Sequence, residues 1–308
     1  MRIFYFFLLL ICCQVGSAKQ LALSFDDGLN PQNNPNAKQI NPNAKQINQA
    51  LLATLAQHKV QAIVFPALNQ IGSEAGLDMI KDWGDRGHRI GNHSAEHLSL
   101  NNKEVSLLRY IQGMQQAHDV LHTFPNFVPR YRFPFLKEGD TVAKRDGVRQ
   151  WLKSQHYQSG AVSIDASDWY YNQLFLKYQA ANDVESLTKL KQAYIAHLLD
   201  RAEYYDGLAG QTLGRSPKHV LLLHVRAINA AWLNDVIEAF VQQDWQFIDS
   251  DTAYQDPLYQ VELNTLPAGE SILWSIAQLY GLKNLRYPAE DAPYEQQHLA
   301  NFGLYDAD

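Results

Sequence analysis

The chain has 308 residues, of which 46% are hydrophobic, 11% aromatic and 19% charged, which is typical of a folded globular protein and excludes a disordered or collagen-like chain. The formal net charge is −6 at pH 7, so the protein lacks the basic field that binds nucleic acids or anionic membranes. We therefore expect no nucleic-acid partner, and the length allows one large domain or two smaller ones.

The first 18 residues are predicted to be a secretory signal peptide. Arg2 precedes an apolar run from Ile3 to Cys13, and the small residues Gly16 to Ala18 follow as a cleavage site. An uncleaved membrane anchor is the main alternative, but the apolar run is shorter than the ~20 residues that cross a bilayer. A lipoprotein is less favoured, because bulky residues precede both cysteines.

Cleavage after Ala18 would place the mature protein outside the cytoplasm, secreted or periplasmic, with no stable membrane span. It would also remove Cys12 and Cys13, the two cysteines of the chain. Neither disulfides nor thiolate ligands would then be available, so histidine and carboxylate side chains would have to hold any metal.

After this leader, strands and helices are predicted to alternate. The first strand, 19–25, is a short apolar run that ends at Asp26-Asp27-Gly28. A polar segment follows, in which the heptapeptide NPNAKQI at 34–40 is repeated at 41–47. We interpret the duplication as a tolerated loop insertion, because added loop length costs little entropy. A rim that touches substrate is the alternative.

The remaining elements follow the same alternation. Strands are expected at 60–65, 88–92, 131–133, 161–164, 220–223 and 246–248, and helices at 47–55, 75–86, 103–121, 143–154, 183–204 and 229–242. Asn101 is the expected N-cap of the helix at 103–121. This order favours a parallel α/β barrel or open sheet, in which functional groups gather at the carboxyl ends of the strands. Beyond Asp256 we expect one apolar stretch, 272–282, in a packed or partly loose tail.

Two groups of side chains at predicted strand ends could carry chemistry. Of the adjacent carboxylates Asp26 and Asp27, one can ligate a cation while the other handles a proton. Asp-Asp-Gly is also an ordinary turn sequence, so the pair alone is weak evidence. His93 and His97 are four residues apart, a spacing that suits two imidazoles on one zinc ion.

Spacing alone does not decide the chemistry of the histidines. His118 and His122 have the same separation inside the predicted helix 103–121, where we interpret them as surface or packing residues. The segment 93–97, HSAEH, also fits the H-x-x-E-H pattern of inverted zinc peptidases, with Glu96 as general base. That pattern requires a helix that carries both histidines, whereas this pair follows a predicted strand.

Five short motifs occur in a fixed order, each at a predicted strand end. They are SFDDG at 24–28, HSAEH at 93–97, RFPF at 132–135, DASDW at 165–169 and LLH at 222–224. With them the chain resembles the polysaccharide deacetylases of carbohydrate esterase family four, the NodB homology domain. The resemblance spans about two thirds of the chain, and five ordered motifs are far more specific than any one of them.

The resemblance implies a fold and a reaction. The fold would be α/β, a distorted (β/α) barrel of the NodB-homology type at 19–250, with a C-terminal extension at 251–308 that packs on the domain or trails from it. The reaction would be metal-dependent hydrolysis of N-acetyl groups on an amino-sugar polysaccharide or oligosaccharide, with release of acetate. The sequence makes no prediction of oligomeric state.

The resemblance also implies a metal centre with a base beside it. Asp27, His93 and His97 would bind one divalent metal, with zinc expected and cobalt or another divalent cation as alternatives. Asp26 would be the general base that takes a proton from the attacking water. Arg132 would hold Asp26 ionised and oriented, with the nearby Arg130 as a competitor for that role.

The remaining motif residues would act on the other side of the substrate. His224 would protonate the departing amine, and Asp168 would tune its acidity. The metal and the backbone N–H of Phe135 would stabilise the oxyanion. Trp169 and Leu222 would form the wall of the pocket for the acetyl methyl group.

Four features depart from the family pattern. Leu136 follows the third motif where glycine is usual, and Phe135 stands where tyrosine is frequent. Val225 and Arg226 follow the fifth motif without an assigned role. A long segment at 170–218 separates the last two motifs and is expected to shape the substrate groove.

Two other functions remain as alternatives at this point. One is the inverted-motif zinc metallopeptidase, and the other is a glycan-binding protein that keeps the fold without catalysis. The substrate also stays open among chitin oligomers, peptidoglycan, poly-N-acetylglucosamine and acetylated xylan, because loops rather than the metal site select the polymer.

Overall fold

The computed structural model describes residues 18–31, 43–286, 288–289 and 292–305. The strands are β1 (Lys19–Asp27), β2 (Ile63–Pro66), β3 (Arg89–Asn92), β4 (Phe127–Tyr131), β5 (Lys137–Gly139), β6 (Gln158–Ser159), β7 (Lys218–His224), β8 (Trp245–Phe247) and β9 (Ala268–Gly269). Residues 1–17 of the predicted signal peptide, and residues 32–42 with most of the duplicated heptapeptides, lie outside the described residues.

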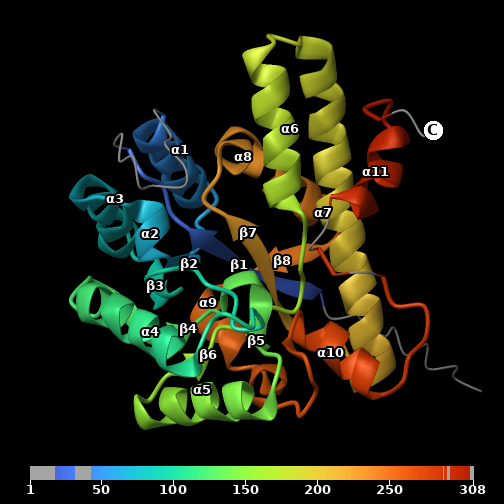
Figure 1. Ribbon diagram of the computed structural model, residues 1–308. Helices are drawn as coiled ribbons and strands as arrows, with labels where there is room; N and C mark the ends of the chain where they lie inside the picture. Colours follow the sequence, from blue (N-terminus) through green and yellow to red (C-terminus); the bar gives the residue numbers. More distant parts are fainter. Residues whose placement is uncertain (1–17, 32–42, 287, 290–291, 306–308) are drawn as a thin grey trace, which may run out of the picture.

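Eleven α-helices and two short 3₁₀ helices are present in the described residues (Figure 1). The α-helices are α1 (Ala44–Gln57), α2 (Leu68–Ile71), α3 (Glu74–Asp85), α4 (Leu107–Leu121), α5 (Val142–Ser154), α6 (Asp168–Ala180), α7 (Val184–Leu213), α8 (Ala227–Gln242), α9 (Ser250–Tyr254), α10 (Ile272–Leu279) and α11 (Pro293–Ala300). The 3₁₀ helices are η1 (Pro134–Leu136) and η2 (Pro257–Gln260).

The core of the fold is one parallel sheet around β1. The hydrogen-bonded path runs β6-β4-β3-β2-β1-β7, and β8 also pairs with β1. Strand β7 lies along one edge of β1, from Gln20 to Asp26. The other edge is shared by β8, beside residues 19–21, and β2, beside residues 24–27. This parallel arrangement confirms the predicted α/β class.

The segment 158–164 contacts both ends of that path. Its first two residues form β6 and pair with β4. Six residues later, Ile164 bridges to Leu221 of β7, and its carbonyl accepts the N–H of Leu222. The sheet therefore curls, so that the segment after β6 reaches β7 at the other end of the path. This curvature gives the distorted barrel that was predicted from the sequence. Of the strand expected at 161–164, only the bridge at Ile164 is present.

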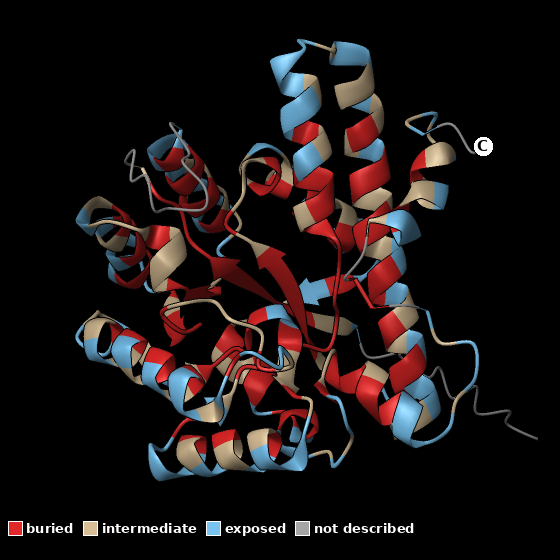
Figure 2. Cartoon of the chain, in the orientation of Figure 1, coloured by how far each residue is buried: buried red, intermediate tan, exposed pale blue. Residues whose placement is uncertain are grey.

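Burial explains why the helices lie where they do. The middle of β1 is apolar and fully buried, and α1 turns Leu51, Leu52 and Leu55 inward at helical spacing. Figure 2 shows this arrangement, with a buried sheet and helices that are buried on one side and exposed on the other. Each such leucine contributes about 1.5–3 kcal/mol by leaving water.

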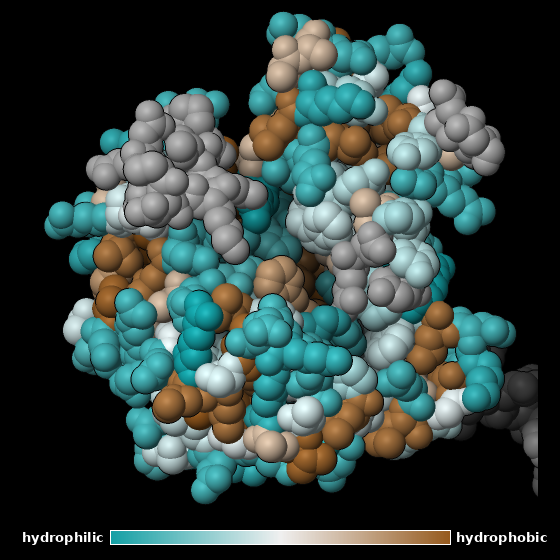
Figure 3. All heavy atoms as spheres, in the orientation of Figure 1, coloured by the Kyte–Doolittle hydropathy of each residue, from teal (hydrophilic) through white to brown (hydrophobic). Residues whose placement is uncertain are grey.

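The outer surface is mixed in character. Figure 3 shows hydrophilic residues over much of the face seen in Figure 1, with apolar residues scattered among them. Single exposed apolar side chains such as Leu108 and Val184 are ordinary on a soluble domain. Among the described residues, no helix combines the length and apolarity needed to span a bilayer.

Most predicted elements agree with the structure to within three residues at each end, but the starts of β4 and α4 do not. Strand β4 begins at Phe127, four residues before the predicted start at 131, and α4 begins four residues late. Asn101 is not its N-cap, because its side chain accepts the Gly139 N–H instead. The cap is Ser106, whose hydroxyl accepts the Arg109 N–H at 3.2 Å. Asn102 accepts the Glu104 N–H and forms a local turn, which keeps residues 102–105 out of the helix.

Helix α6 was not predicted from the sequence, and the helix predicted for α7 was too short. Together α6 and α7 form the long helical hairpin at the top of Figure 1. The first turn of α6 contains Trp169, Tyr170 and Tyr171, and aromatic residues are commoner in strands than in helices. Helix α7 continues nine residues beyond the predicted end at 204, through two glycines that weaken the helical signal. It stops at Gly214, which adopts the left-handed conformation.

The described part of 251–308 packs against the rest of the protein. Helices α10 and α11 both lie against α7, and β9 pairs antiparallel with β5, just after the third motif. The predicted extension thus contacts the elements that follow the third and fourth motifs.

Candidate active site

Four strands of the sheet carry the candidate site at their carboxyl ends. Strand β1 ends with Asp26 and Asp27, β3 leads to His93, β4 leads to Arg132, and β7 ends with His224. These strands are parallel, and in the order β4-β3-β2-β1-β7 only β2 separates them, so side chains up to about 200 positions apart meet at one end of the sheet.

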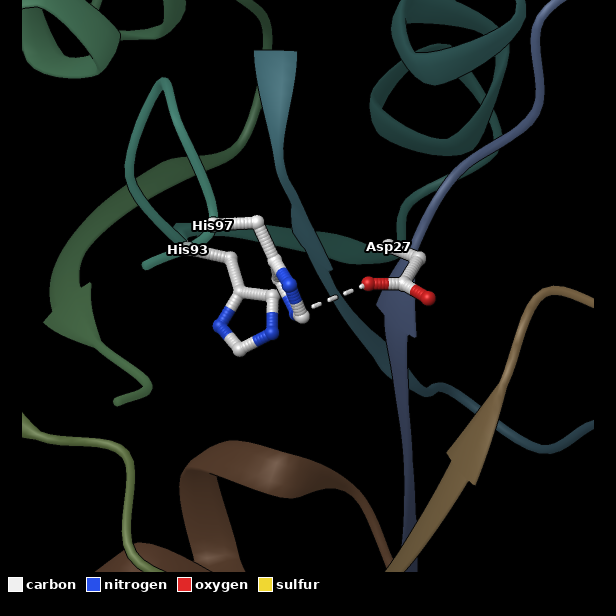
Figure 4. A group of neighbouring side chains, drawn as sticks. All are labelled: Asp27, His93 and His97. Carbon is white, nitrogen blue, oxygen red and sulfur yellow. Dashed lines mark ion pairs between the residues drawn. The ribbon is translucent and has the colours of Figure 1, made fainter. Parts of the chain in front are cut away.

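Asp27, His93 and His97 come together as a possible metal centre. One ligand atom from each lies within 4.8 Å of the others. Figure 4 shows both imidazoles beside the Asp27 carboxylate, with an ion pair of 3.3 Å between His97 Nε2 and Asp27 Oδ1. Left-handed backbone at Asp27 (φ 80°) and His97 (φ 51°) helps to turn these side chains inward.

The surroundings prepare His93 to act as a ligand. Its Nδ1–H donates to the Arg132 carbonyl at 2.7 Å, which leaves the lone pair of Nε2 directed toward the centre. Burial holds the pKa of His93 well below its usual value, so the ring is neutral. A neutral imidazole with its second nitrogen already hydrogen-bonded is the usual state of a histidine metal ligand.

The donor set fits a single divalent cation. Asp27 Oδ1 is buried and accepts no hydrogen bond from any residue that the structure describes. A buried carboxylate oxygen without a donor is costly unless a cation or another donor occupies the space beside it. One carboxylate and two imidazoles leave coordination positions open, which is typical of catalytic rather than structural zinc sites.

Asp26 lies next to this centre in a different environment. Its Oδ1 accepts a 2.9 Å hydrogen bond from Arg132 Nη1, and its Oδ2 lies 3.5 Å from His93 Nε2. Burial raises the pKa of Asp26 to about 6, although Arg132 acts in the opposite direction. A carboxylate with a pKa near neutrality suits proton transfer at physiological pH.

Arg132, and not Arg130, is the residue that contacts Asp26. The Arg132 guanidinium is 1% exposed and also donates to the Ser24 hydroxyl and the Gly160 carbonyl. Arg130 instead donates to the Ser159 carbonyl and packs over the ring of Tyr254, 3.8 Å from its centroid. The guanidinium of Arg132 is therefore held rigidly against the carboxylate.

His224 is held by a buried carboxylate and an amide. Its Nδ1–H donates to Asp168 Oδ1 at 2.6 Å, and its backbone N–H donates to Asp168 Oδ2 at 2.7 Å. Asn229 Nδ2 donates to the same Oδ2 and to the His224 carbonyl. Although burial disfavours the imidazolium, Asp168 raises the pKa of His224 to about 9. With Nδ1 engaged, Nε2 is the atom available for proton transfer.

Sequence reasoning left two residues of this site without a role. Arg226 Nη2 donates to Asp27 Oδ2 at 2.7 Å, and Asn229 supports the Asp168–His224 pair. Although burial acts in the opposite direction, Arg226 lowers the pKa of Asp27 to about 2 and keeps this carboxylate ionised. The one signal in the sequence was their proximity to the fifth motif.

Residues 14–151 match the family model of polysaccharide deacetylase. This match confirms the predicted resemblance to polysaccharide deacetylases over that segment. The protein is accordingly a hydrolase of the deacetylase type. The matched segment contains the first three motifs, and the fold brings the fourth and fifth to the same edge of the sheet.

Solved structures of family-four carbohydrate esterases are similar to this deacetylase. A mutant of BA3943, described as a family-four carbohydrate esterase pseudoenzyme with restored activity, superposes with a TM-score of 0.51 at 16% identity, over 77% of this chain and 68% of that one. A family-four carbohydrate esterase of Streptococcus mutans gives 0.49 at 19% identity, over 76% and 87%. No curated protein matches the chain in sequence. The first of these similarities supports the distorted-barrel fold.

The third motif of the deacetylase has an unusual backbone. Phe135 and Leu136 both have positive φ, 57° and 56°, so Leu136 adopts the conformation for which glycine is common. The Phe135 side chain is 57% exposed, and its ring lies edge-on to His97 with centroids 4.7 Å apart. Phe135 is therefore placed at the mouth of the metal centre.

The two residues expected to form the acetyl pocket lie close in the chain to other residues of the candidate site. Leu222 is buried in β7, where it pairs with Ser24, two residues before Asp26. Trp169 directly follows Asp168 and is partly buried, and its indole N–H donates to the Ala289 carbonyl. The structure thus places Leu222 beneath the site and anchors Trp169 to the C-terminal part of the chain.

The inverted-peptidase interpretation does not agree with the geometry of the deacetylase. Residues 93–97 form a bend and not a helix. Glu96 points to the surface, where it forms a 2.7 Å ion pair with Arg109. His118 and His122 stack on each other in α4, and His118 binds the Tyr157 hydroxyl, as packing residues do.

We expect Arg226→Leu to weaken divalent-metal affinity about 10- to 100-fold, because partners of metal ligands have effects of this size. The variant leaves all three ligands in place but removes the donor that orients Asp27. Chelator competition with zinc measures the change. Arg215→Leu, which removes an ion pair with Asp256 at the opposite end of β7, is the control. Equal affinity in wild type and Arg226→Leu would show that Asp27 needs no such support.

Proposed function

We propose that this deacetylase hydrolyses N-acetyl groups of an amino-sugar polysaccharide or oligosaccharide and releases acetate in a metal-dependent reaction. The observation that carries the proposal is the arrangement of three groups around one space. These are the Asp27, His93 and His97 cluster, the Asp26 carboxylate and the Asp168–His224 pair. A metal centre with a base and an acid beside it supplies the groups that metal-dependent amide hydrolysis uses.

Asp27, His93 and His97 are the residues that would hold the cation, with zinc expected and cobalt or another divalent ion as alternatives. Such a cation supplies Lewis-acid polarisation of the acetyl carbonyl. The contribution of the protein is to keep two of these ligands, Asp27 and His93, in the charge state that binding needs. Arg226 keeps Asp27 ionised, and burial keeps His93 neutral.

Asp26 is assigned the role of general base toward the attacking water. Arg132 occupies Oδ1 and fixes the carboxylate plane, so Oδ2, on the side of His93, is the oxygen that accepts the proton. Because Arg132 is itself fixed by Ser24 and Gly160, the base cannot rotate away from the centre. Such pre-positioning lowers the entropic part of the barrier.

His224 is assigned the role of general acid toward the leaving amine. Asp168 binds Nδ1–H and so selects the orientation in which Nε2 faces the substrate. The same contact favours the protonated ring, which has a proton to give. As the C–N bond breaks, this proton converts the departing nitrogen into a neutral amine.

The remaining assignments concern the acetyl group. The backbone N–H of Phe135 is assigned to the developing oxyanion, and its left-handed backbone supports this role because it sets the direction of that N–H. Leu222 and Trp169 are assigned to the wall around the acetyl methyl group. We further assign the protein to the secreted or periplasmic space, on the basis of its leader sequence.

One experiment tests the proposal and selects the substrate. Acetate release is measured on chitin oligomers, peptidoglycan, poly-N-acetylglucosamine and acetylated xylan, each with and without a chelator and after return of zinc or cobalt. We expect release from at least one of the three amino-sugar glycans, loss of release with the chelator, and recovery with the metal. Binding of a glycan without acetate release under all these conditions would instead indicate a non-catalytic glycan-binding protein.

A further inference from the structure

The C-terminal part of the chain contacts the fourth motif. This motif contains Asp168, the hydrogen-bond partner of the proposed general acid His224. Ala289 provides two of these contacts. Its N–H donates to Asp165 Oδ2, and its carbonyl accepts the Trp169 indole N–H, both at 3.0 Å. Glu295 provides the third, since its Oε1 accepts the hydroxyl of Ser167 at 2.7 Å. Three alternate residues of the motif are thus bound by residues more than 110 positions away.

The residues of the fourth motif therefore bind two sets of partners. Residues 165, 167 and 169 bind the C-terminal segment, whereas Asp168 binds His224 and Asn229. Because Asp168 lies between two bound neighbours, its backbone cannot shift without breaking contacts to Ala289 or Glu295. The position of the Asp168 carboxylate is accordingly linked to the C-terminal segment.

Glu295 is the centre of this arrangement. Its side chain is only 4% exposed and lies between Ser167, His197 and Arg201. Arg201 Nη2 donates to Oε1 at 2.9 Å, and His197 Nδ1 lies 3.1 Å from Oε2. Although burial works against ionisation, these donors hold the pKa of Glu295 below its usual range. A buried carboxylate with three donors is ionised and tightly localised.

The hydrogen bonds that His197 and Glu295 make with Ser167 also fix the start of α6. The Ser167 N–H donates to His197 Nε2 at 3.0 Å, so the proton of that ring is on Nδ1 and points to Glu295. Ser167 is the N-cap residue of α6, yet its hydroxyl caps no N–H of the helix because it binds Glu295. Asp168 is the first residue of this helix. Glu295 and His197 thus replace the local cap that would otherwise hold the helix start.

We propose that Ala289 and Glu295 form a C-terminal clamp that positions Asp168 against His224, so that the segment after the barrel is part of the catalytic apparatus. The inference rests on the proposed function of the Asp168–His224 pair. Glu295 is a positioning residue here, because it acts through Ser167 and touches no substrate. A misplacement of about 1 Å at a catalytic group costs on the order of 100-fold in rate.

The test replaces Glu295 by Ala and, separately, Trp169 by Phe in the full-length protein. Glu295→Ala removes the acceptor for Ser167. For Glu295→Ala we expect kcat for acetate release to fall about 10- to 100-fold with KM within about twofold. For Trp169→Phe we expect a smaller fall of the same kind.

A second measurement needs neither substrate nor activity. The His224 Nδ1–H in its short bond to Asp168 should give a downfield proton resonance in the NMR spectrum, assigned by its loss in Asp168→Asn. We expect this resonance to disappear or move upfield in Glu295→Ala, at a temperature where circular dichroism shows the variant folded. If wild type released no acetate from any glycan, the proposed function would fail, yet this resonance would still decide on the clamp.

Two control variants separate positioning from general stability. Gln296→Ala changes the next residue of α11, whose amide donates to the exposed Tyr305 hydroxyl, and should leave kcat and the resonance unchanged. Leu121→Ala opens a core cavity at the end of α4 and should lower the melting temperature without a change in kcat or the resonance. A folded Glu295→Ala with wild-type kcat and resonance, or equal losses in Leu121→Ala, would overturn the proposal.

Discussion

Asp26→Asn is expected to lower the rate of acetate release about 10²- to 10⁴-fold, the range that a general base contributes, while the metal content stays near that of wild type. The change is nearly isosteric, and the side-chain oxygen of asparagine can still accept the hydrogen bond from Arg132 Nη1. The amide cannot take a proton from water. Rates on the preferred glycan and metal content by elemental mass spectrometry measure the two effects.

Glu96→Gln is the matched control for this experiment, since it makes the same acid-to-amide change within the second motif. Glu96 forms an exposed ion pair with Arg109, so the variant should retain wild-type activity. The reverse pattern, an active Asp26→Asn and an inactive Glu96→Gln, would contradict the assignment of the base and favour the inverted-peptidase mechanism.

His97→Ala is expected to lower zinc affinity by more than about 100-fold and to abolish metal-dependent activity with it. Loss of a ligand should exceed the 10- to 100-fold effect of losing a ligand's partner. We choose His97 over His93 because His93 also binds the Arg132 carbonyl, so that its removal would disturb the third motif as well. Chelator competition with zinc and with cobalt measures the affinity.

The second histidine pair of the chain provides the control. His122→Ala removes one member of the stacked pair in α4, which has the same sequence spacing as His93 and His97. This variant should bind zinc as wild type does. If His97→Ala kept wild-type affinity, His97 would have to be removed from the ligand set, and Asp27 and His93 would need another partner.

Much of the site could be predicted because it follows a local rule. Asp26, His93 and His224 each lie at the end of a predicted strand, and parallel strands bring such ends together. The α/β fold followed from the same predicted strands and from the helical periodicity between them. Short-range pattern was therefore sufficient to predict which strand ends meet at the candidate site.

The residues that sequence reasoning missed depend on contacts between distant segments. Arg226 meets Asp27 across 199 positions, and Glu295 meets Ser167 across 128. No pattern near an arginine or a glutamate indicates which distant group it binds. The same reason explains Asn101, which looked like a helix cap but binds the Gly139 N–H, 38 positions away.

The central position of β1 has a consequence for how the site forms. This strand pairs with β7 and β8, whose residues follow it by about 200 positions. Closing so large a loop is slow, and high contact order generally delays folding. Asp26, Asp27 and His224 can meet only when β1 has paired with β7. Activity should therefore appear at the end of folding and be absent from any intermediate in which these two strands are not yet paired.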